Sequence, residues 1–338
     1  MSTTTDPTTA PFGSVFGNHM AVATLAEDVY TYGGAAQPLE NFSLHPATHA
    51  FHYGSTCFEG LKAHRQADGS VAIFRLDDHV ARLRSSIGKL RMAIPDADLV
   101  RGMIIDVVSA DLDHVPDSPG SLYLRPTFIG TAPTLGAAAS PSATGMLYVI
   151  DSPVGDYFVG GIHPLTIYIE QTTPRTTPQF GSAKCGANYV MALGPTLDAK
   201  RDYQADQVLF ATGGDVTETG AANFFLVDDK RIVTRQLDDS FLHGVTRMSV
   251  LQIAADLGYE VEERMVALDE LRDWATHGEM FLSGTAAVVT PVGKVIVSGE
   301  SITVGDGQPG AQTLRLREAL TNVQTGSAPD THGWLTHV

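Results

Sequence analysis

The sequence predicts a mixed α/β (α+β) protein of two domains. At 338 residues, 43% of them hydrophobic, the chain is longer than a typical single domain and has enough apolar material for two cores. Strand-like and helix-like patterns are interspersed through both halves. The stretch 151–161 has the Gly and Pro content of a linker. We therefore expect a first domain over 1–157 that begins with a disordered leader (1–13), a linker over 158–163 and a second domain over 164–338.

Composition and charge exclude several kinds of partner. A net charge of −16 argues against nucleic acid and anionic membrane surfaces, which both bind basic patches. The two cysteines, Cys57 and Cys185, are far apart in sequence, and no His spacing typical of a metal site is present, so neither a disulfide framework nor a zinc site is expected. No apolar run reaches 18 residues and the leader does not resemble a signal peptide, which predicts a cytoplasmic protein.

Local patterns predict the elements of each half. The aromatic and glycine-rich segment 45–61 is expected to be a loop between strands. A helix that starts at Asp77 or Asp78 and stops before Pro95 has apolar residues three and four apart, at Val80, Leu83, Ile87 and Leu90. The other expected helices cover 100–111, 188–200 and 246–257. The expected strands cover 71–75, 121–129, 145–150, 165–171, 207–211, 223–227, 231–234, 259–266, 279–282 and 288–297.

Lys184 is the first candidate catalytic residue. It is the only charged residue between Arg175 and Asp198, and its neighbours are small or apolar. A desolvated amine loses its proton more easily, as a lysine must before it attacks an aldehyde and holds a cofactor as an imine. The alternative is a surface lysine at a helix start whose stem lies along apolar neighbours.

Three further features would suit a cofactor attached to Lys184. Gly244-Val245-Thr246 opens a predicted helix, where free N–H groups and a hydroxyl favour phosphate. Ser283-Gly284-Thr285-Ala286 follows a strand and could form a second anion-binding turn. Glu218 lies among small residues and needs a cationic partner, such as a protonated pyridine nitrogen. A helix cap and an ordinary turn would explain the first two separately, but pyridoxal 5'-phosphate would use all three with Lys184.

These residues belong to a longer series of ordered motifs. The chain resembles the branched-chain amino acid aminotransferases of the fold-type-IV pyridoxal phosphate enzymes from about Phe51 to Lys294. The matching segments are His52-Tyr53-Gly54-Ser55-Thr56-Cys57-Phe58-Glu59-Gly60, 74–83, Tyr123-Leu124-Arg125-Pro126, Lys184 to Tyr189, Glu218, Gly244-Val245-Thr246-Arg247 and Ser283 to Ala286.

The resemblance implies a role for each of these site residues. Lys184 would be the Schiff-base lysine, Tyr189 would bind the ring oxygen and Glu218 the ring nitrogen of the cofactor. The phosphate would be held by Arg82, Val245, Thr246, Gly284 and Thr285. The substrate side chain would lie against Tyr53, Phe58 and Tyr157, with Tyr123 and Arg125 as a polar gate, and its carboxylate would meet the amides of Thr285 and Ala286.

The resemblance also implies a fold and an assembly. We expect a smaller N-terminal α/β domain and a larger C-terminal domain with a β-barrel-like core, with the active site between them. A loop of the other subunit of a homodimer, similar to 131–138, would complete that site. The chain departs from the family pattern at Arg175, Ala187 and His243, and these changes affect the expected substrate range rather than the cofactor.

The leading hypothesis is an L-amino-acid transaminase that transfers the amino group of leucine, isoleucine or valine to 2-oxoglutarate. A D-amino-acid or amine transaminase and an aminodeoxychorismate-type lyase share the cofactor residues and remain alternatives. A non-catalytic phosphate-binding module is an alternative of a different class. The partners expected in the leading case are small-molecule substrates and a second copy of the chain.

Overall fold

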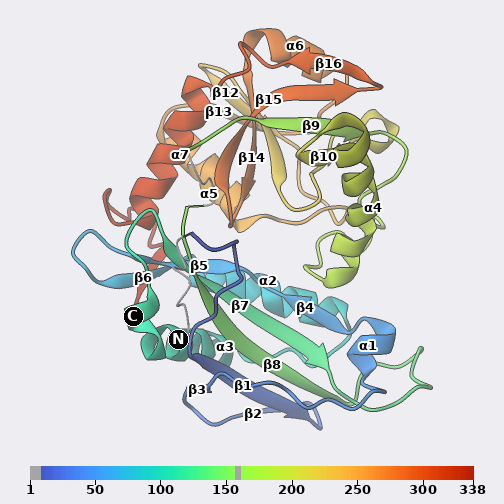
Figure 1. Ribbon diagram of the computed structural model, residues 1–338, viewed down its shortest axis with the longest axis vertical. Coiled ribbons are helices and arrows are strands. Elements are labelled where there is room, and N and C mark those ends of the chain that lie inside the picture. The colour runs from blue at the N-terminus through green and yellow to red at the C-terminus, as the bar shows by residue number, and fades with distance from the viewer. Residues whose placement is uncertain (1–8, 157–160) are drawn as a thin grey trace. The chain divides into compact units, whose positions relative to one another are not determined.

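The structure is a computed structural model that describes residues 9–156 and 161–338 (Figure 1). Tyr157, most of the predicted leader and half of the predicted linker lie outside the described residues. Contacts divide the chain into two compact units, which we describe separately. Unit 1 comprises Met1–Val159, Ala183–Gly186 and Val323–Val338, and unit 2 comprises Gly160–Ser182 and Ala187–Asn322.

Unit 1 is built on a nine-stranded antiparallel sheet. Its main order is β17 (Leu335–His337), β6 (Val71–Phe74), β5 (Leu61–Arg65), β7 (Ser121–Gly130), β8 (Thr144–Val154), β1 (His19–Ala26) and β2 (Val29–Tyr32). The short β3 (Gln37–Pro38) pairs with β1, and β4 (Thr56–Phe58) pairs with β7.

Two helices pack against this sheet, α2 (Leu76–Lys89) and α3 (Ala97–Ala110) (Figure 1). The apolar stripe predicted for the first helix is confirmed, since Val80, Leu83 and Ile87 are buried. That helix starts at Leu76 rather than at an aspartate cap, after Arg75 in a left-handed conformation. The second helix starts earlier than predicted because the Asp96 side chain accepts a hydrogen bond from the Asp98 N–H and caps it.

The segment 45–61 is more regular than the predicted loop. It contains the short helix α1 (His49–Tyr53) and strand β4, and β5 begins at its last residue. Strand β4 pairs with the end of β7 at Cys57 opposite Phe128, whereas β5 pairs farther back along β7. This pairing joins residues about seventy positions apart, so no local pattern could reveal it.

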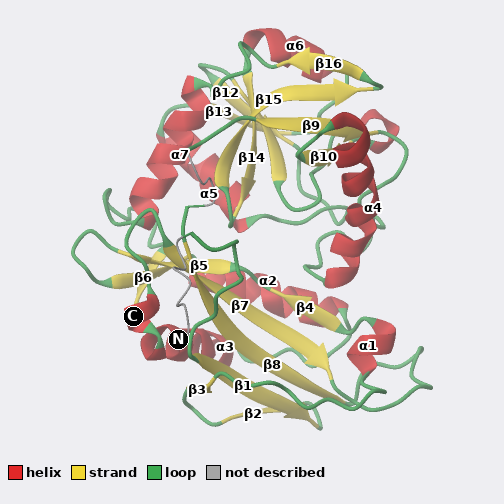
Figure 2. Ribbon diagram, viewed as in Figure 1, coloured by secondary structure: helices red, strands yellow, loops and turns green. Residues whose placement is uncertain are grey.

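Unit 2 contains an eight-stranded mixed sheet that is strongly curled (Figure 2). Its main order is β10 (Gln207–Phe210), β9 (Leu165–Glu170), β15 (Val288–Val297), β14 (Glu279–Gly284), β11 (Asn223–Val227), β12 (Arg231–Thr234) and β13 (Glu260–Glu263), with β16 (Glu300–Thr303) beside β15. The hairpin predicted over 223–227 and 231–234 is confirmed. Its apolar core includes Ile167, Phe224 and Leu282.

Four helices accompany this sheet: α4 (Gly186–Tyr203), α5 (Val245–Asp256), α6 (Glu270–His277) and α7 (Ala311–Gln324). The end of α7 passes into unit 1, and β17 after it pairs with β6 there. The two units are therefore comparable in length. The domain boundaries drawn from the sequence stay a prediction. Among the described residues, no helix combines the length and apolarity needed to cross a membrane.

Candidate active site

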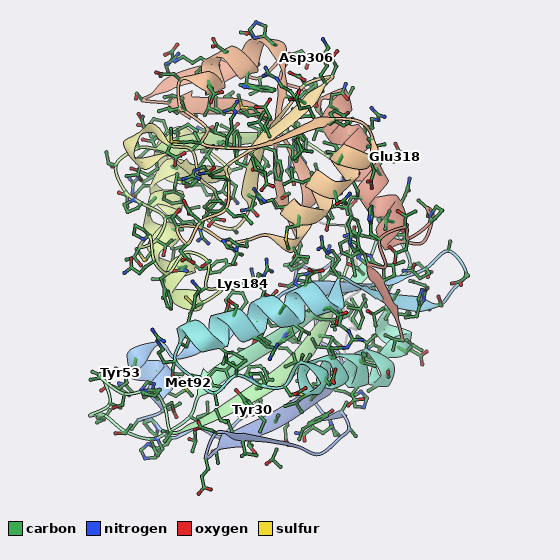
Figure 3. The ribbon with its side chains drawn as sticks, turned by 180° about the vertical axis from the view of Figure 1, so that it is seen from behind. Tyr30, Tyr53, Met92, Lys184, Asp306 and Glu318 are labelled. Atoms are coloured by element: carbon green, nitrogen blue, oxygen red, sulfur yellow. The ribbon has the colours of Figure 1, made fainter. Side chains whose placement is uncertain are left out.

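Lys184 is fixed in unit 1 by its own backbone. The Phe58 N–H donates to the Lys184 carbonyl at 3.0 Å, and the Lys184 N–H donates to Ser86 Oγ of α2, also at 3.0 Å. The half-buried side chain of Lys184, labelled in Figure 3, packs on Phe58. Its Nζ lies 5.3 Å from the centroid of that ring. Strand β4 and helix α2 thus set the position of this lysine.

Arg82, the predicted phosphate ligand, forms a bidentate ion pair with Glu59. Arg82 Nε donates to Glu59 Oε1 at 2.6 Å and its Nη2 donates to Oε2 at 2.8 Å. His79, one turn earlier on α2, places Nδ1 2.8 Å from Oε2, and the Gly60 N–H donates to the same oxygen at 3.2 Å. The carboxylate is fully buried, so all of its partners come from the protein.

The electrostatics of this cluster fix its protonation. Burial raises the pKa of Glu59, but the charge of Arg82 and the hydrogen bonds from Arg82 and His79 outweigh it and hold that pKa well below its ordinary range. Burial lowers the pKa of His79, and the nearby charges of Arg82 and Lys184 lower it further against the opposing effect of Glu59. Both lowered pKa values are consistent with a neutral His79 imidazole that donates from Nδ1 to an ionised Glu59.

The predicted polar gate also contacts the Phe58 ring. The Arg125 guanidinium carbon is 4.6 Å from the Phe58 centroid and 5.2 Å from that of Tyr123, and Nη2 donates to the Tyr123 hydroxyl at 2.8 Å. Arg125 Nε is buried with no hydrogen-bond partner among the described residues. Tyr123 and Arg125 line a cavity of about 230 Å³ together with Phe12, Gly13, Phe16, Ile150, Asp151 and Ser152.

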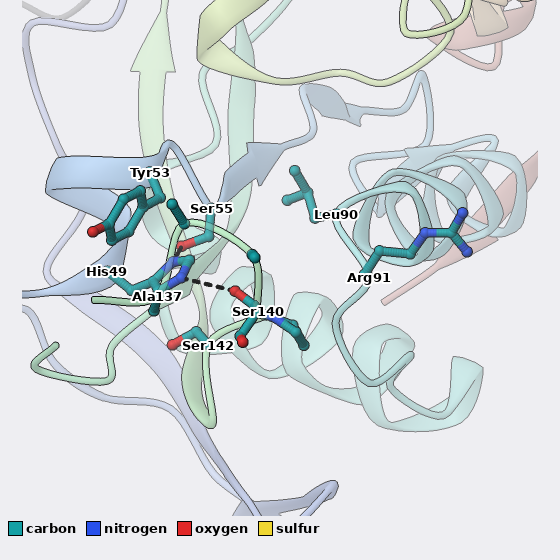
Figure 4. Close-up of a pocket in the computed structure, with 11 residues that line it drawn as sticks. His49, Tyr53, Ser55, Leu90, Arg91, Ala137, Ser140 and Ser142 are labelled. Carbon is teal, nitrogen blue, oxygen red and sulfur yellow. Dashed lines mark hydrogen bonds between the residues drawn. The ribbon is translucent and has the colours of Figure 1, made fainter. Parts of the chain in front are cut away.

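Tyr53 lies in a different pocket. A cavity of about 390 Å³ is lined by Tyr53, His49 and Ser55 together with residues 137–142, and across from them by Leu90 and Arg91 (Figure 4). The Tyr53 hydroxyl donates to the carbonyl of Leu135, within the loop 131–138. His49 connects Ser55 Oγ at 2.9 Å with the Ser140 carbonyl at 3.2 Å. The structure therefore joins Tyr53 to the loop expected to serve another subunit, and separates it from the Tyr123 cavity.

In unit 2, Glu218 is buried against an arginine. Arg175 Nη1 is 2.8 Å from Glu218 Oε1, although it is not aligned for a hydrogen bond, and both side chains are almost fully buried. The Leu242 N–H donates to Oε1 at 3.0 Å, and Asn223 Nδ2 donates to Oε2 at 3.3 Å. The Arg175 guanidinium carbon also lies 5.8 Å from the Tyr189 ring centroid. One cation therefore contacts both residues predicted to bind the cofactor ring.

The predicted phosphate donors of unit 2 are at the start of α5. The first backbone bond of that helix runs from the Met248 N–H to the Gly244 carbonyl, so the helix itself does not use the N–H groups of Val245 and Thr246. Both residues are buried. A Cβ on Gly244 would collide with Asn223 Oδ1, so only glycine permits this approach.

The β14–β15 turn carries the remaining predicted ligands, Gly284, Thr285 and Ala286. Just before it, Ser283 Oγ is buried with no hydrogen-bond partner among the described residues. Arg317 of α7 braces the turn, since its Nη1 donates to the carbonyls of Ala287 and Val289, each at 2.7 Å. A braced turn beside an unsatisfied hydroxyl suits an anionic ligand.

The chain belongs to the amino-transferase class IV family, whose family model matches residues 56–295. It is 38% identical to the branched-chain-amino-acid aminotransferase of Mycobacterium tuberculosis (strain ATCC 25618 / H37Rv), with 97% of this chain and 92% of that protein covered. It is 37% identical to branched-chain-amino-acid aminotransferase 2 of Bacillus subtilis (strain 168), with 98% and 93% covered. The family predicted from the motifs is confirmed.

Solved structures of the same family share the fold. A crystal structure of the T.th. branched-chain amino acid aminotransferase with pyridoxamine 5'-phosphate superposes with a TM-score of 0.80 at 32% identity, covering 95% of this chain and 99% of that one. Another structure of the T.th. enzyme is complexed with N-(5'-phosphopyridoxyl)-L-glutamate. The predicted fold class and the predicted cofactor, pyridoxal 5'-phosphate, are thereby confirmed.

The donor set of this chain fits that cofactor. Lys184 supplies an amine and Arg82 a cation in unit 1. Unit 2 supplies the N–H groups that open α5, the orphaned hydroxyl of Ser283 and the buried carboxylate of Glu218. An aldehyde, a phosphate and a ring nitrogen need these kinds of partner.

Sequence reasoning assigned no site role to four residues that support these groups: Glu59, Arg175, Asn223 and Arg317. Glu59 carried the same signal as Glu218, an acid without a charged neighbour in a small and apolar stretch. The other departures from the family pattern are less central. Ala187 is exposed on α4, and His243 Nε2 lies 2.8 Å from the Asp238 carbonyl.

Proposed function

We propose that this chain is a branched-chain-amino-acid aminotransferase that transfers the amino group of L-leucine, L-isoleucine or L-valine to 2-oxoglutarate. The products are the branched 2-oxo acid and L-glutamate. The names of the relatives support this substrate class. The cofactor supplies an electrophilic carbon and a ring that accepts electron density from the substrate Cα.

One observation carries the proposal: Lys184 and Arg125 contact the same aromatic ring, Phe58. Lys184 then removes and returns the substrate Cα proton beside an apolar surface that suits a branched side chain. Arg125 supplies a guanidinium to the same region, which the second carboxylate of 2-oxoglutarate needs when it leaves water. A single pocket can thus accept an apolar and an acidic substrate in turn.

Glu218 has a separate role in this proposal. Its carboxylate already accepts hydrogen bonds from Leu242 and Asn223 and lies against Arg175. These partners favour the ionised form, which accepts a hydrogen bond from a protonated ring nitrogen. Tyr189 would donate to the ring oxygen, while Arg82, Val245, Thr246, Gly284 and Thr285 would hold the phosphate.

The decisive experiment is a steady-state panel of amino donors with 2-oxoglutarate as acceptor. We expect kcat/KM for leucine, isoleucine and valine to exceed that for alanine, aspartate, D-alanine and a primary amine. Preference for D-alanine or the amine would favour the related transaminases, and pyruvate release from aminodeoxychorismate would favour the lyase. A colourless protein without turnover after incubation with pyridoxal phosphate would indicate a non-catalytic module.

We also propose a homodimer in the cytoplasm, and two exposed apolar surfaces support the dimer. On α4, Val190, Leu193 and Leu197 recur at helical spacing with 70%, 53% and 55% of their area exposed. Leu135, in the loop 131–138, is 66% exposed. Light scattering of wild type and of a Leu193→Lys, Leu197→Lys variant tests this assembly; a monomeric wild type would refute it.

A further inference from the structure

Among the described acids of unit 1, Glu59 is the most buried. Each of its contacts is with a hydrogen-bond donor. Both oxygens engage Arg82, through Nε at 2.6 Å and Nη2 at 2.8 Å. Two parallel bonds between a carboxylate and a planar guanidinium fix the plane of that guanidinium as well as its position. The third nitrogen of the guanidinium, Nη1, consequently has a set direction as well.

The cost of this arrangement argues against a purely stabilising role. A buried ion pair often contributes no more to stability than a well-packed apolar pair of the same size, because both charges must lose their water. Here the carboxylate also engages His79 and the Gly60 N–H. The Glu59 carboxylate therefore has four contacts: two with Arg82, one with His79 and one with the Gly60 N–H. Together they fix its orientation, which a contribution to stability alone would not require.

The same strand connects this cluster to Lys184. Phe58, the residue before Glu59, donates its N–H to the Lys184 carbonyl and places its ring under the Lys184 amine. A shift of Glu59 therefore moves Arg82 relative to an amine that is anchored one residue away. The backbone of β4 is the common reference for both groups.

We propose that Glu59 is a positioning residue that orients Arg82 toward the phosphate of the cofactor and thereby makes binding depend on that phosphate. The inference rests on the proposed function, in which Arg82 is a phosphate ligand. Glu59 itself touches neither phosphate nor substrate. His79 assists, since its Nδ1 lies within hydrogen-bond distance of the same carboxylate.

The test compares the dissociation constants of pyridoxal 5'-phosphate and pyridoxal, which lacks the phosphate, for the cofactor-free enzyme. In Glu59→Gln one of the two accepting oxygens becomes an NH2 group, which meets either Arg82 Nε or Arg82 Nη2, both donors themselves, so the guanidinium must turn. We expect the constant for pyridoxal 5'-phosphate to rise at least about tenfold while that for pyridoxal changes less than about threefold. Glu59→Asp keeps the charge but withdraws it by one methylene. We expect this variant also to lose the preference for pyridoxal 5'-phosphate over pyridoxal.

Two further variants separate the possible outcomes. Asp78→Asn is the matched control, since it breaks the 2.7 Å pair with Arg75 on the same helix and should leave the selectivity unchanged. Arg82→Ala should abolish the selectivity; if it does not, Arg82 is no phosphate ligand and the proposed site assignment fails. If Arg82→Ala loses the selectivity but Glu59→Asp and Glu59→Gln keep it, only the role of Glu59 is overturned. Circular dichroism shows which variants are folded. If Glu59→Gln does not fold, the dissociation constants of Glu59→Asp decide whether Glu59 orients Arg82.

Discussion

Asp151 should make unit 1 less stable as the pH rises, which is unusual for an aspartate. Its carboxyl lies buried on β8 beside the buried carboxyl of Asp111, which follows α3. The two groups converge on Gly17, where a Cβ would collide with both. Asp111 accepts hydrogen bonds from the N–H groups of Asn18 and His19, each at 2.9 Å, and its Oδ1 lies 2.6 Å from His19 Nδ1.

These donors all lie on Asp111, and neither carboxyl oxygen of Asp151 has a hydrogen-bond partner among the described residues, which favours the proton on Asp151. Burial and the adjacent Asp111 carboxylate raise the pKa of Asp151 to about 8, from an ordinary value of 3.8. Between these values the folded protein holds a proton that the unfolded chain releases. The associated stabilisation is complete below the unfolded pKa and is lost as the pH rises through the folded pKa, at no more than about 1.4 kcal/mol per pH unit.

Asp151→Asn should remove this dependence, because an amide cannot ionise and has nearly the same shape. Urea denaturation of wild type and variant at several values between pH 5 and pH 8.5, followed by circular dichroism, measures the difference. We expect the stability of the variant relative to wild type to increase steadily across that range. Asp113→Asn, an exposed acid next to α3, is the control that should run parallel to wild type. A constant difference between Asp151→Asn and wild type would refute the shared-proton reasoning.

Three predictions concern the chemistry. Lys184→Ala should lose the visible absorbance of the bound cofactor and all transfer while remaining folded, whereas the exposed Lys294→Ala should retain both; transfer by Lys184→Ala would contradict its role. Glu218→Gln should slow the Cα deprotonation of leucine by at least roughly 10²-fold, and unchanged single-turnover kinetics would mean that another group tunes the ring. Arg125→Ala should weaken the glutamate half-reaction by about 2 to 4 kcal/mol and the leucine half-reaction much less, and equal losses would make Arg125 structural.

The elements that local periodicity defines were predictable from the sequence. The hairpin of β11 and β12 has apolar strands on both sides of an Asp-Asp-Lys turn, and α2 has a stripe of three- and four-residue spacing. Elements that depend on distant partners were missed. Strand β17 has three residues and exists because Leu335 pairs with Phe74 across most of the chain. A segment of that length has no period of its own.

The site residues show the same difference between local and distant information. Residue types and spacing predicted Lys184, Glu218 and the helix start at Thr246, because each is unusual among its sequence neighbours. What the sequence could not supply is the partner that each buried charge requires. Glu218 was predicted to need a cation, and the expected cation was the cofactor ring alone. The structure adds Arg175, which is 43 positions earlier in the chain.

Glu59 and Glu218 obey one rule that links this protein's charge to its chemistry. A chain of net charge −16 has acids in excess, and most of them face water, where no partner is required. Glu59 and Glu218 are buried, and each pairs with an arginine. Arg82 is itself a predicted phosphate ligand, and Arg175 lies beside Tyr189, which is predicted to bind the cofactor ring. In both cases a buried acid with uncharged neighbours in sequence is matched by an arginine from elsewhere in the chain, whereas the buried Asp151 lies beside Asp111 and keeps its proton instead. Because a guanidinium stays charged, Arg82 keeps the pKa of Glu59 well below its ordinary range, so Glu59 acts by accepting hydrogen bonds and not by releasing a proton.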